Sequence, residues 1–567
     1  MEYPGLKFYD KAVSHSLNYP EVPIYQLLDD TAQKYPTRPI TCFMGKRINY
    51  ATLKQSSDNL AASLHKMGVG AGDKVALLLP NFPGFLIAYY ALLKIGAVVV
   101  PLNPLHTEPE LDFLFNDSGA EIAITIPMFS AKVISLQKKT KLKKIIISFI
   151  ADFLPFPLNI VQKMRETKLF KRARQAAEIE ILLMRTMHQT PAPTTFKATE
   201  PDPRQLAVLI YSGGTTGTSK GIMLSHYSIV ANAHQVVAWG GLTEDERMLA
   251  ILPLFHGFGM SICMNSSVLA GMEMVLLPKF DAGDMAKTIH KYRPTMTAVV
   301  PTILVALSNL ANIDKYDLSC LKAVWVGASP LTDGIKTTFE KKTGGRTIEG
   351  YGLTEAVTAI MANPKDGKHK VGSIGIPFPD VKARIVSLDG KQELPSGETG
   401  EIVLQTPTMM MGYYNRPEET AAAVVDGWLF TGDIGYRDED GYLYITDRKK
   451  DLIIVGGFNV FPREIDELLY QHPKIKEGIT VGIPDNYKGE RIKVYIILKT
   501  GEEATFDEFK QYFRKHLTPY KVPSDIEFRS ELPKSAIGKI LRRTLRNEEI
   551  EKLENRKIED NLNAGKA

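Results

Sequence analysis

A loop rich in glycine and hydroxyl residues, placed between two apolar runs, constrains this chain more than any other feature. Residues 211–221 read YSGGTTGTSKG. The apolar run at 206–210 predicts a buried strand before the loop, and a second strand is expected at 222–226. Glycines allow the backbone to approach a ligand and turn its N–H groups inward, the hydroxyls add donors, and Lys220 adds a positive charge. This arrangement favours a polyphosphate ligand.

The loop differs from the Walker A motif, in which Lys is preceded by Gly and followed by Ser or Thr, because Lys220 stands between Ser219 and Gly221. The alternative is a flexible surface loop of the same composition. On the polyphosphate interpretation, the candidate ligand contacts are Ser212, Gly213, Gly214, Thr215, Thr216, Gly217 and Lys220.

Strands and helices alternate in the first part of the chain. Residues 74–80 predict a buried strand, 81–95 a helix and 97–100 a second strand, which together make a βαβ unit. A helix is expected at 109–116 and another strand at 122–126. Such alternation predicts an α/β body with a parallel sheet covered by helices on both faces.

The pattern of predicted strands and helices changes in the second half of the chain. Residues 382–386 and 401–405 alternate like strands, with turn signals between them, and predict a small antiparallel barrel-like subdomain at about 360–446. Beyond residue 450, helices at 463–471 and 506–516 and strands at 478–482 and 492–498 predict a small α+β domain. We therefore expect an N-terminal domain over 1–450 and a C-terminal lid domain over 451–567.

Residues 138–174 contain eleven basic residues and only two acidic residues, Asp152 and Glu166. An apolar, aromatic stretch at 145–157 lies between the basic clusters. A basic element with aromatic residues suits the anionic face of a membrane. A strand followed by a solvated basic helix is the alternative, because such stretches have several explanations.

Composition excludes several classes of protein. The net charge of +5 over 567 residues does not favour a nucleic-acid binder. Cys42, Cys263 and Cys320 lie far apart, which predicts neither a disulfide framework nor a cysteine metal site and favours the cytoplasm. The N-terminus lacks a signal-peptide pattern, and no run reaches the ~18 apolar residues of a membrane span.

Five further stretches carry chemically useful residues: LFHGFG at 254–259, EGYGLTE at 349–355, TGD at 431–433, DRKKD at 447–451 and PKSAIGK at 533–539. Each has a plain alternative when taken alone. His256 suits a core histidine, Glu355 a surface carboxylate, Asp433 a turn cap, and Lys539 a solvated lysine. The charges at 447–451 also suit a solvated linker.

Together with VGASPL at 326–331, these stretches resemble the adenylate-forming superfamily of acyl- and aryl-CoA synthetases, firefly luciferase and peptide-synthetase adenylation domains. The resemblance extends from about residue 25 to 543, and residues 151–157 with their basic flanks resemble bacterial long-chain fatty-acid–CoA ligases. It implies that a fatty carboxylate reacts with ATP to form acyl-AMP and pyrophosphate, and that coenzyme A then displaces AMP.

The resemblance also implies roles for single residues. Lys539 would bridge the carboxylate and the α-phosphate, Thr215 and Glu355 would contact Mg²⁺, and Thr354 would bond the α-phosphate. His256 would lie beside the acyl carboxylate. The remaining nucleotide contacts would be Gly327, Ala328, Ser329, Glu349, Gly350, Tyr351, Gly352, Asp433 and Arg448.

A domain rotation is implied as well. Lys450 falls at the hinge position of the superfamily, and Gly456 and Gly457 would line the path of coenzyme A after the rotation. The resemblance further implies a homodimer. The composition of 138–174 predicts peripheral contact of this segment with the inner face of the membrane. The rival functions are an aryl-CoA ligase, a luciferase-like oxidase and, from another class, a membrane-associated lipid-binding protein without activity.

Overall fold

The computed structural model describes the chain except for residues 1–2, 213–218, 457, 486–488, 535–539 and 565–567. From residue 556 onward it describes the backbone alone. The chain forms two compact units. Unit 1 comprises residues 1–383 and 404–429, and unit 2 comprises 384–403 and 430–567. Within the described part, no helix combines the length and the apolar character needed to cross a membrane.

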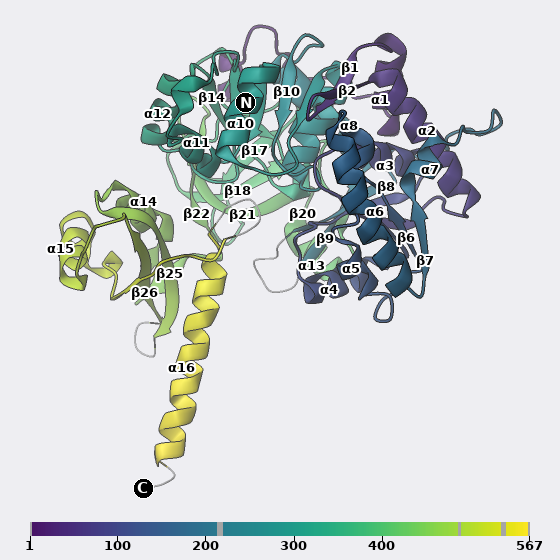
Figure 1. Cartoon of the computed structure of the whole chain (residues 1–567). Helices are drawn as coiled ribbons and strands as arrows, with labels where there is room; N and C mark the ends of the chain where they lie inside the picture. The colour runs from purple at the N-terminus through teal and green to yellow at the C-terminus, as the bar shows by residue number, and fades with distance from the viewer. Residues whose placement is uncertain (1–2, 213–218, 457, 486–488, 535–539, 565–567) are drawn as a thin grey trace. The chain divides into compact units, whose positions relative to one another are not determined.

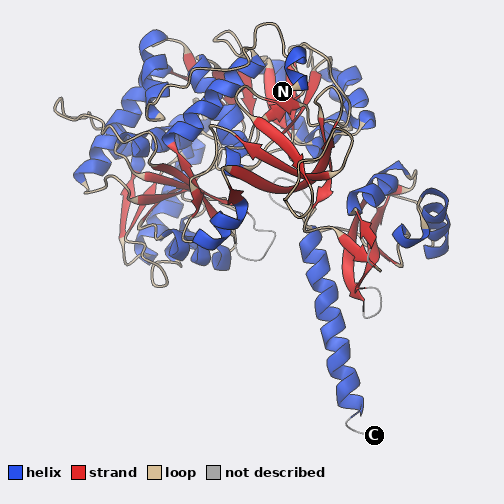
Figure 2. Ribbon diagram, turned by 180° about the vertical axis from the view of Figure 1, so that it is seen from behind, coloured by secondary structure: helices blue, strands red, loops and turns tan. Residues whose placement is uncertain are grey.

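Unit 1 is built on two large sheets flanked by helices (Figures 1 and 2). The first has the order β19-β9-β8-β4-β3-β5-β6-β7 over the described residues. Its strands are β3 (Lys74–Leu78), β4 (Val98–Pro101), β5 (Ile122–Thr125), β6 (Lys144–Ile147), β7 (Glu180–Leu183), β8 (Leu206–Ser212), β9 (Lys220–Ser225) and β19 (Gly412–Tyr413). The pairs from β8 through β7 are parallel, whereas β8–β9 and β9–β19 are antiparallel.

The second sheet of unit 1 has the order β16-β15-β14-β13-β12-β10-β11-β1-β2 in the part of the chain that is described. Its strands are β1 (Pro39–Phe43), β2 (Lys46–Asn49), β10 (Arg247–Ala250), β11 (Glu273–Leu276), β12 (Met296–Val299), β13 (Ala323–Val326), β14 (Arg346–Tyr351), β15 (Met361–Ala362) and β16 (Ile376–Pro377). The central pairs from β11 to β14 are parallel, so the loops after β10, β12, β13 and β14 leave the sheet at one edge.

The helices of unit 1 follow the local sequence signals. Helix α4 begins with a capping box of Thr107 and Glu110 and ends at Gly119, whose φ of 68° suits glycine. The α-helices are α1 (Tyr25–Lys34), α2 (Tyr50–Lys66), α3 (Pro83–Lys94), α4 (Glu108–Ser118), α5 (Ser130–Ile134), α6 (Leu158–Ala176), α7 (Met184–Gln189), α8 (His226–Gly240), α9 (Ser266–Ala270), α10 (Ala282–Tyr292), α11 (Pro301–Ser308), α12 (Asp333–Thr343) and α13 (Pro417–Ala423). Shorter helical segments are η1 (Pro4–Phe8), η2 (Ile150–Phe153), η3 (Gly259–Asn265), η4 (Ile313–Lys315) and η5 (Thr354–Ala356).

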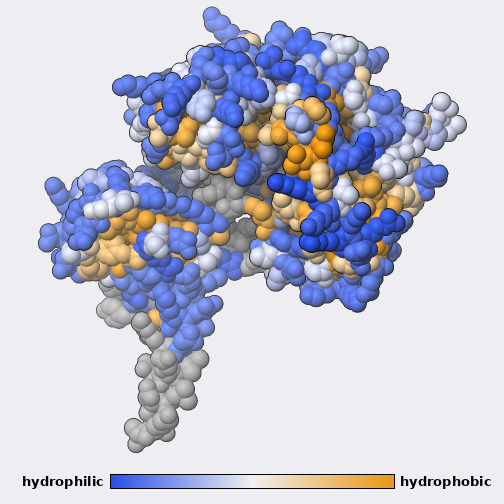
Figure 3. Space-filling view, viewed as in Figure 1, coloured by the Kyte–Doolittle hydropathy of each residue, from blue (hydrophilic) through white to orange (hydrophobic). Residues whose placement is uncertain are grey.

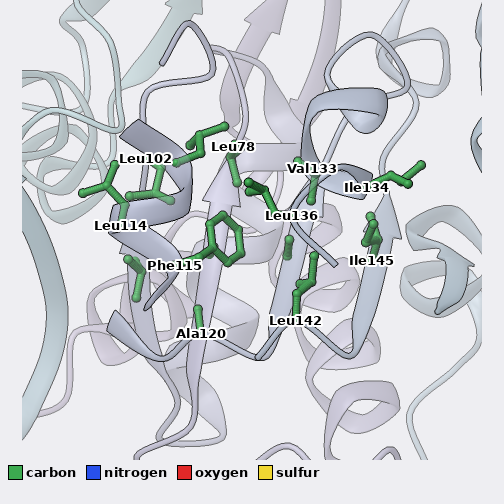
Figure 4. Packing of buried hydrophobic residues seen from close by; sticks show 14 of the residues in the cluster. Leu78, Leu102, Leu114, Phe115, Ala120, Val133, Ile134, Leu136, Leu142 and Ile145 are labelled. Carbon is green, nitrogen blue, oxygen red and sulfur yellow. The ribbon is translucent and has the colours of Figure 1, made fainter. Parts of the chain in front are cut away.

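A large apolar core lies under α4 and α5. Leu114 and Phe115 of α4 and Val133 of α5 pack against Leu78 of β3 and Ile145 of β6, all of them buried (Figure 4). Helix α3 contacts β3 and β4 and is buried along its whole length, which explains why its sequence is free of charge before Lys94. The predicted α/β body with helices on both faces is therefore confirmed.

Unit 2 contains the lid-like α+β part and most of the third sheet. The third sheet has the order β17-β18-β21-β20, with β22 beside β21, and consists of β17 (Lys382–Val386), β18 (Gly400–Gln405), β20 (Val424–Val425), β21 (Trp428–Arg437) and β22 (Leu443–Arg448). The fourth sheet has the strand order β24-β23-β26-β25, with β27 beside β26. Its strands are β23 (Ile453–Val455), β24 (Phe458–Val460), β25 (Ile475–Asp485), β26 (Gly489–Leu498) and β27 (Asp525–Phe528). Its helices are α14 (Pro462–Gln471), α15 (Phe506–His516), η6 (Pro519–Lys521) and α16 (Arg542–Ala564).

Strand and helix positions agree closely with the sequence patterns. The predicted strands at 382–386 and 401–405 are β17 and β18, and the helix expected at 506–516 is α15. The strands expected at 478–482 and 492–498 form parts of the longer β25 and β26. The division of the chain at residue 450 stays a prediction.

Candidate functional site

Two loops with predicted site residues leave the nine-stranded sheet at its carboxyl edge. Gly327, Ala328 and Ser329 follow β13, and the segment from Gly352 to Glu355 follows β14. Val326 of β13 pairs with Glu349 of β14, so the two loops start side by side. Ligands of open α/β sheets bind outside this edge, which makes it the candidate nucleotide site.

Glycines allow these loops to approach one another closely. A Cβ on Gly327 would lie 3.3 Å from the Phe258 ring and 3.4 Å from the Gly350 carbonyl oxygen. A Cβ on Gly352 would overlap the Thr358 carbonyl oxygen, at 0.9 Å. The structure therefore brings the segments around 258, 327 and 350 together.

The turn after Glu355 is strained. Val357 and Thr358 have φ angles of 56° and 79°, which β-branched residues rarely adopt. Strain of this kind costs about 1–3 kcal/mol per residue and persists only where the surroundings impose it. The Glu355 carbonyl oxygen accepts a hydrogen bond from the Met410 N–H at 2.7 Å, and the Ala356 carbonyl oxygen accepts one from Thr408 Oγ1 at 3.0 Å. These bonds fix the turn that carries Glu355.

The Glu355 carboxylate is oriented by a tyrosine. Tyr413 Oη donates to Glu355 Oε1 at 3.0 Å. Burial and the nearby Glu355 and Glu419 carboxylates raise the pKa of Tyr413 well above its ordinary value, so its hydroxyl remains a donor. An oxygen donor set of this kind suits Mg²⁺, which binds one or two carboxylates and completes its shell with substrate phosphates. No cluster of three His, Cys, Asp or Glu side chains that could hold a metal occurs in the described ranges.

His256 is neutral at physiological pH. Burial lowers its pKa to about 4, and its Nδ1 accepts the Phe258 N–H at 3.1 Å, which leaves the ring proton on Nε2. The adjacent Gly257 approaches Thr358, because a Cβ there would lie 2.3 Å from Thr358 Oγ1. His256 therefore lies on a loop that contacts the Thr354–Thr358 turn.

Ser212 ends β8 and Lys220 begins β9, and the two residues pair in the antiparallel ladder. The Lys220 ammonium forms an ion pair with Glu419 and lies 4.9 Å from the Tyr413 ring centroid. Arg416 Nε lies 3.6 Å from the other Glu419 oxygen. We call the group of Lys220, Glu355, Tyr413, Arg416 and Glu419 the phosphate edge.

The predicted site residues of unit 2 form a separate group. Asp433 is 1% exposed and pairs with Arg448, with 2.5 Å between Oδ1 and Nε. The next residue, Lys449, donates from its backbone to the Gly432 carbonyl oxygen and pairs with Glu401. Lys450 is the next residue in the chain. Gly456 directly follows β23 and has a φ of 58°.

A buried ion cluster flanks Lys450. Arg542 binds Asp466 at 2.5 Å and Asp451 at 3.0 Å, and lies 3.6 Å from Asp447. Asp447 also accepts the Arg463 N–H at the start of α14, at 2.7 Å. Burial raises the pKa of both Asp447 and Asp466, the latter to about 6. We call Asp447, Asp451, Asp466 and Arg542 the hinge cluster.

Several predicted site residues lie outside the described residues: Gly213, Gly214, Thr215, Thr216, Gly217, Gly457 and Lys539. The sequence indicated the charged segment 447–451, which contains Asp447 and Asp451, but assigned no role to Tyr413, Glu419, Asp466 or Arg542. No local pattern marks these residues, since each is a single polar residue in a strand end, a helix or a turn.

The chain matches two family models. The model of the AMP-binding enzyme matches residues 28–414, and that of its C-terminal domain matches residues 464–539. The chain belongs to the AMP-binding enzyme family. A long-chain-fatty-acid–CoA ligase of Bacillus subtilis is 41% identical over 551 residues, which cover 97% of this chain and 98% of that relative.

Solved structures of the family are similar throughout. An anthranilate CoA ligase in complex with anthranoyl-AMP is 26% identical with a TM-score of 0.82, covering 94% of this chain and 98% of that chain. O-succinylbenzoate coenzyme A synthetase from Bacillus subtilis, in complex with ATP and a magnesium ion, is 28% identical with a TM-score of 0.76, covering 92% and 99%. As a member of the AMP-binding enzyme family, this chain has its candidate nucleotide site where the edge loops of unit 1 meet.

Proposed function

We propose that this enzyme is an ATP-dependent fatty-acid–CoA ligase for medium or long chains. It converts a fatty carboxylate and ATP into acyl-AMP and pyrophosphate, and then acyl-AMP and coenzyme A into acyl-CoA and AMP. The observation that carries the proposal is the 41% identity to a long-chain-fatty-acid–CoA ligase over 97% of the chain. The Glu355, Asp433 and Lys539 residues of the superfamily pattern are also present.

The first step brings two anions together. A carboxylate oxygen bonds to the α-phosphorus while the bond from this phosphorus to the pyrophosphate oxygen breaks. Positive charge placed where the anions meet lowers the barrier, so Lys539 and Lys220 would supply cations and Thr354 a hydroxyl. Thr215 and Glu355 would hold Mg²⁺, which neutralises phosphate charge when bound.

Residues of the superfamily pattern would hold the nucleoside. Tyr351 would stack on the adenine, with the Gly327–Ser329 segment on the other side. The buried carboxylate of Asp433 would accept hydrogen bonds from the ribose hydroxyls, and the Arg448 that pairs with it would lie near the ribose and phosphate.

The second step needs different groups at the same carbon. The thiol of coenzyme A loses its proton and attacks the acyl carbonyl, and AMP leaves as the carbon–oxygen bond breaks. Rotation of 451–567 at Lys450 would remove Lys539 and bring Gly456 and Gly457 to the thiol path. The neutral His256 would lie beside the acyl group and gate this path.

An ATP–pyrophosphate exchange assay with saturated acids of graded length tests the proposal. Exchange should be highest with medium or long chains. An aryl-CoA ligase, the second candidate because a solved neighbour is an anthranilate CoA ligase, would instead prefer aromatic acids. If no acid supports exchange, the result would contradict the ligase proposal and favour the alternative of a lipid-binding protein without activity.

We further propose that residues 138–174 rest on an anionic membrane face. Around the start of α6, Phe156, Val161 and Met164 are 79%, 55% and 71% exposed. Hydrophilic and hydrophobic residues lie next to one another over this helix in the space-filling view (Figure 3). Six basic residues of α6 are exposed: Lys163, Arg165, Lys168, Lys171, Arg172 and Arg174.

A buried carboxylate holds this helix in place. Glu166 of α6 accepts the backbone N–H groups of Ile150 and Ala151, each at 3.0 Å. Exposed apolar side chains beside exposed cations match the requirements for peripheral binding, in which apolar insertion and attraction to anionic lipids add.

Liposome sedimentation tests this surface. Binding should require anionic lipid and fall with salt, and a Lys163→Glu/Lys171→Glu variant should lose it. The matched control is Lys287→Glu/Lys291→Glu on α10, where both lysines are also exposed. Equal binding by both variants would leave only a solvated helix.

A homodimer, also proposed from the superfamily resemblance, is tested by sedimentation velocity.

A further inference from the structure

The ion pair between Lys220 and Glu419 is imposed by the backbone around it. Strand β19 pairs with β9, with Tyr413 opposite Ile222, and the Tyr414 N–H donates to the Gly221 carbonyl oxygen at 2.7 Å. Thr420 of α13 accepts the Tyr413 N–H at 2.8 Å and so ties α13 to this strand. The pairing of β19 with β9 and the hydrogen bond from β19 to α13 therefore hold the backbone of Glu419 close to Lys220.

The charges around this pair favour exchange with another anion. Lys220 is 21% and Glu419 40% exposed, so solvent reaches both groups. Glu419 has a second cation at hand, because Arg416 Nε lies 3.6 Å from it. Arg416 is itself held by Asp117, at 3.3 Å, and Asp117 also accepts the Tyr211 hydroxyl at 2.7 Å. Glu419 thus keeps a cationic partner when Lys220 turns to a different anion.

We infer that Glu419 is a competing anion of the nucleotide site: its carboxylate and a phosphate of ATP bind the same ammonium of Lys220, and each weakens the other. This inference rests on the proposed ATP-dependent function. Glu419 then sets how tightly ATP and pyrophosphate are held, and Arg416 receives the carboxylate when a phosphate takes Lys220. Glu419 is a positioning residue, since it acts through Lys220.

Isothermal titration with the Mg²⁺ complex of α,β-methylene-ATP tests the inference without turnover. Glu419→Gln should tighten binding by about three- to fivefold, the range that a half-exposed ion pair supports. The gain should shrink as salt rises, because screening weakens the pair. Glu418→Gln is the matched control, with the same charge change one residue away on an exposed side chain, and should alter affinity little.

A double-mutant cycle separates competition from a general effect of charge. In a Lys220→Met background, Glu419→Gln should no longer tighten binding. The inference is overturned if Glu419→Gln weakens binding, because Glu419 would then support Lys220, or if it tightens binding equally in both backgrounds. It is also overturned if Lys220→Met leaves affinity unchanged. Pyrophosphate exchange by the unmodified enzyme reports on the ligase proposal separately, so the two failures are distinguishable.

Discussion

The phosphate edge and the hinge cluster both consist of opposite charges in contact, yet they differ in access to water. At the phosphate edge, the side chains of Lys220 and Glu419 are 21% and 40% exposed. In the hinge cluster, those of Arg542, Asp466 and Asp447 are 18%, 10% and 2% exposed, and that of Asp451 is 26% exposed. Exposed pairs contribute about 0–1 kcal/mol and exchange partners readily, whereas breaking a buried pair leaves a charge that nothing compensates.

The difference indicates two uses of charge in one enzyme. On the proposed function, the phosphate edge would keep cations available to an anionic substrate. The hinge cluster binds residues on both sides of Lys450 into one arrangement, since Asp447 precedes Lys450 and Arg542 and Asp466 follow it. Four predictions break or sharpen this contrast.

Removal of Arg542 has the largest expected effect. Arg542→Met leaves three carboxylates without their shared cation and should lower the free energy of unfolding of unit 2 by about 3–5 kcal/mol. Hydrogen exchange in β25 and β26 measures the loss. Arg546→Met, which removes a single pair with Glu490 at 35% exposure of the arginine, should cost less than about 1 kcal/mol. Equal losses would remove the contrast.

The pair of Asp433 and Arg448 has the second largest expected effect. Asp433→Asn keeps the shape but removes a buried charge that is bonded to Arg448. ATP affinity should fall about ten- to hundredfold, the range for a hydrogen bond to a charged group. Titration calorimetry with an ATP analogue measures it. A change in ATP affinity of less than twofold would contradict a direct contact between Asp433 and the nucleotide.

The pH dependence of stability tests the burial of Asp466. Burial raises its pKa to about 6, so the folded chain holds this proton more tightly than the unfolded chain. The resulting stability is full below about pH 4 and is lost as the pH rises through 6. Between pH 5 and 7, the wild type should lose about 1 kcal/mol more than Asp466→Asn. Parallel curves in denaturant titrations would contradict this.

The smallest effect is expected at the phosphate edge. Glu419→Gln should change the free energy of unfolding by less than about 1 kcal/mol, because both partners remain hydrated when separated. Thermal unfolding at low and high salt measures the change. A loss of several kcal/mol would place this pair in the same class as the hinge cluster.

Much of the fold follows from local patterns. The helices expected at 81–95 and 109–116 and the strand expected at 382–386 each correspond to an element that the structure contains. The loops at 327–329 and 352–355 start side by side, because the parallel strands β13 and β14 place their carboxyl ends at one edge. The roles of Lys539 and of residues 213–217 remain predictions.

By itself, the sequence determined which segments form strands and helices, because apolar periodicity, caps and glycines act over a few residues. It also indicated which loops resemble those of the superfamily. Tertiary structure alone decided which charges meet. Glu419 reaches Lys220 through the pairing of β19 with β9, and Arg542 reaches Asp447 through the packing of unit 2. Contacts between residues so distant along the chain depend on strand register and packing, which no local pattern contains.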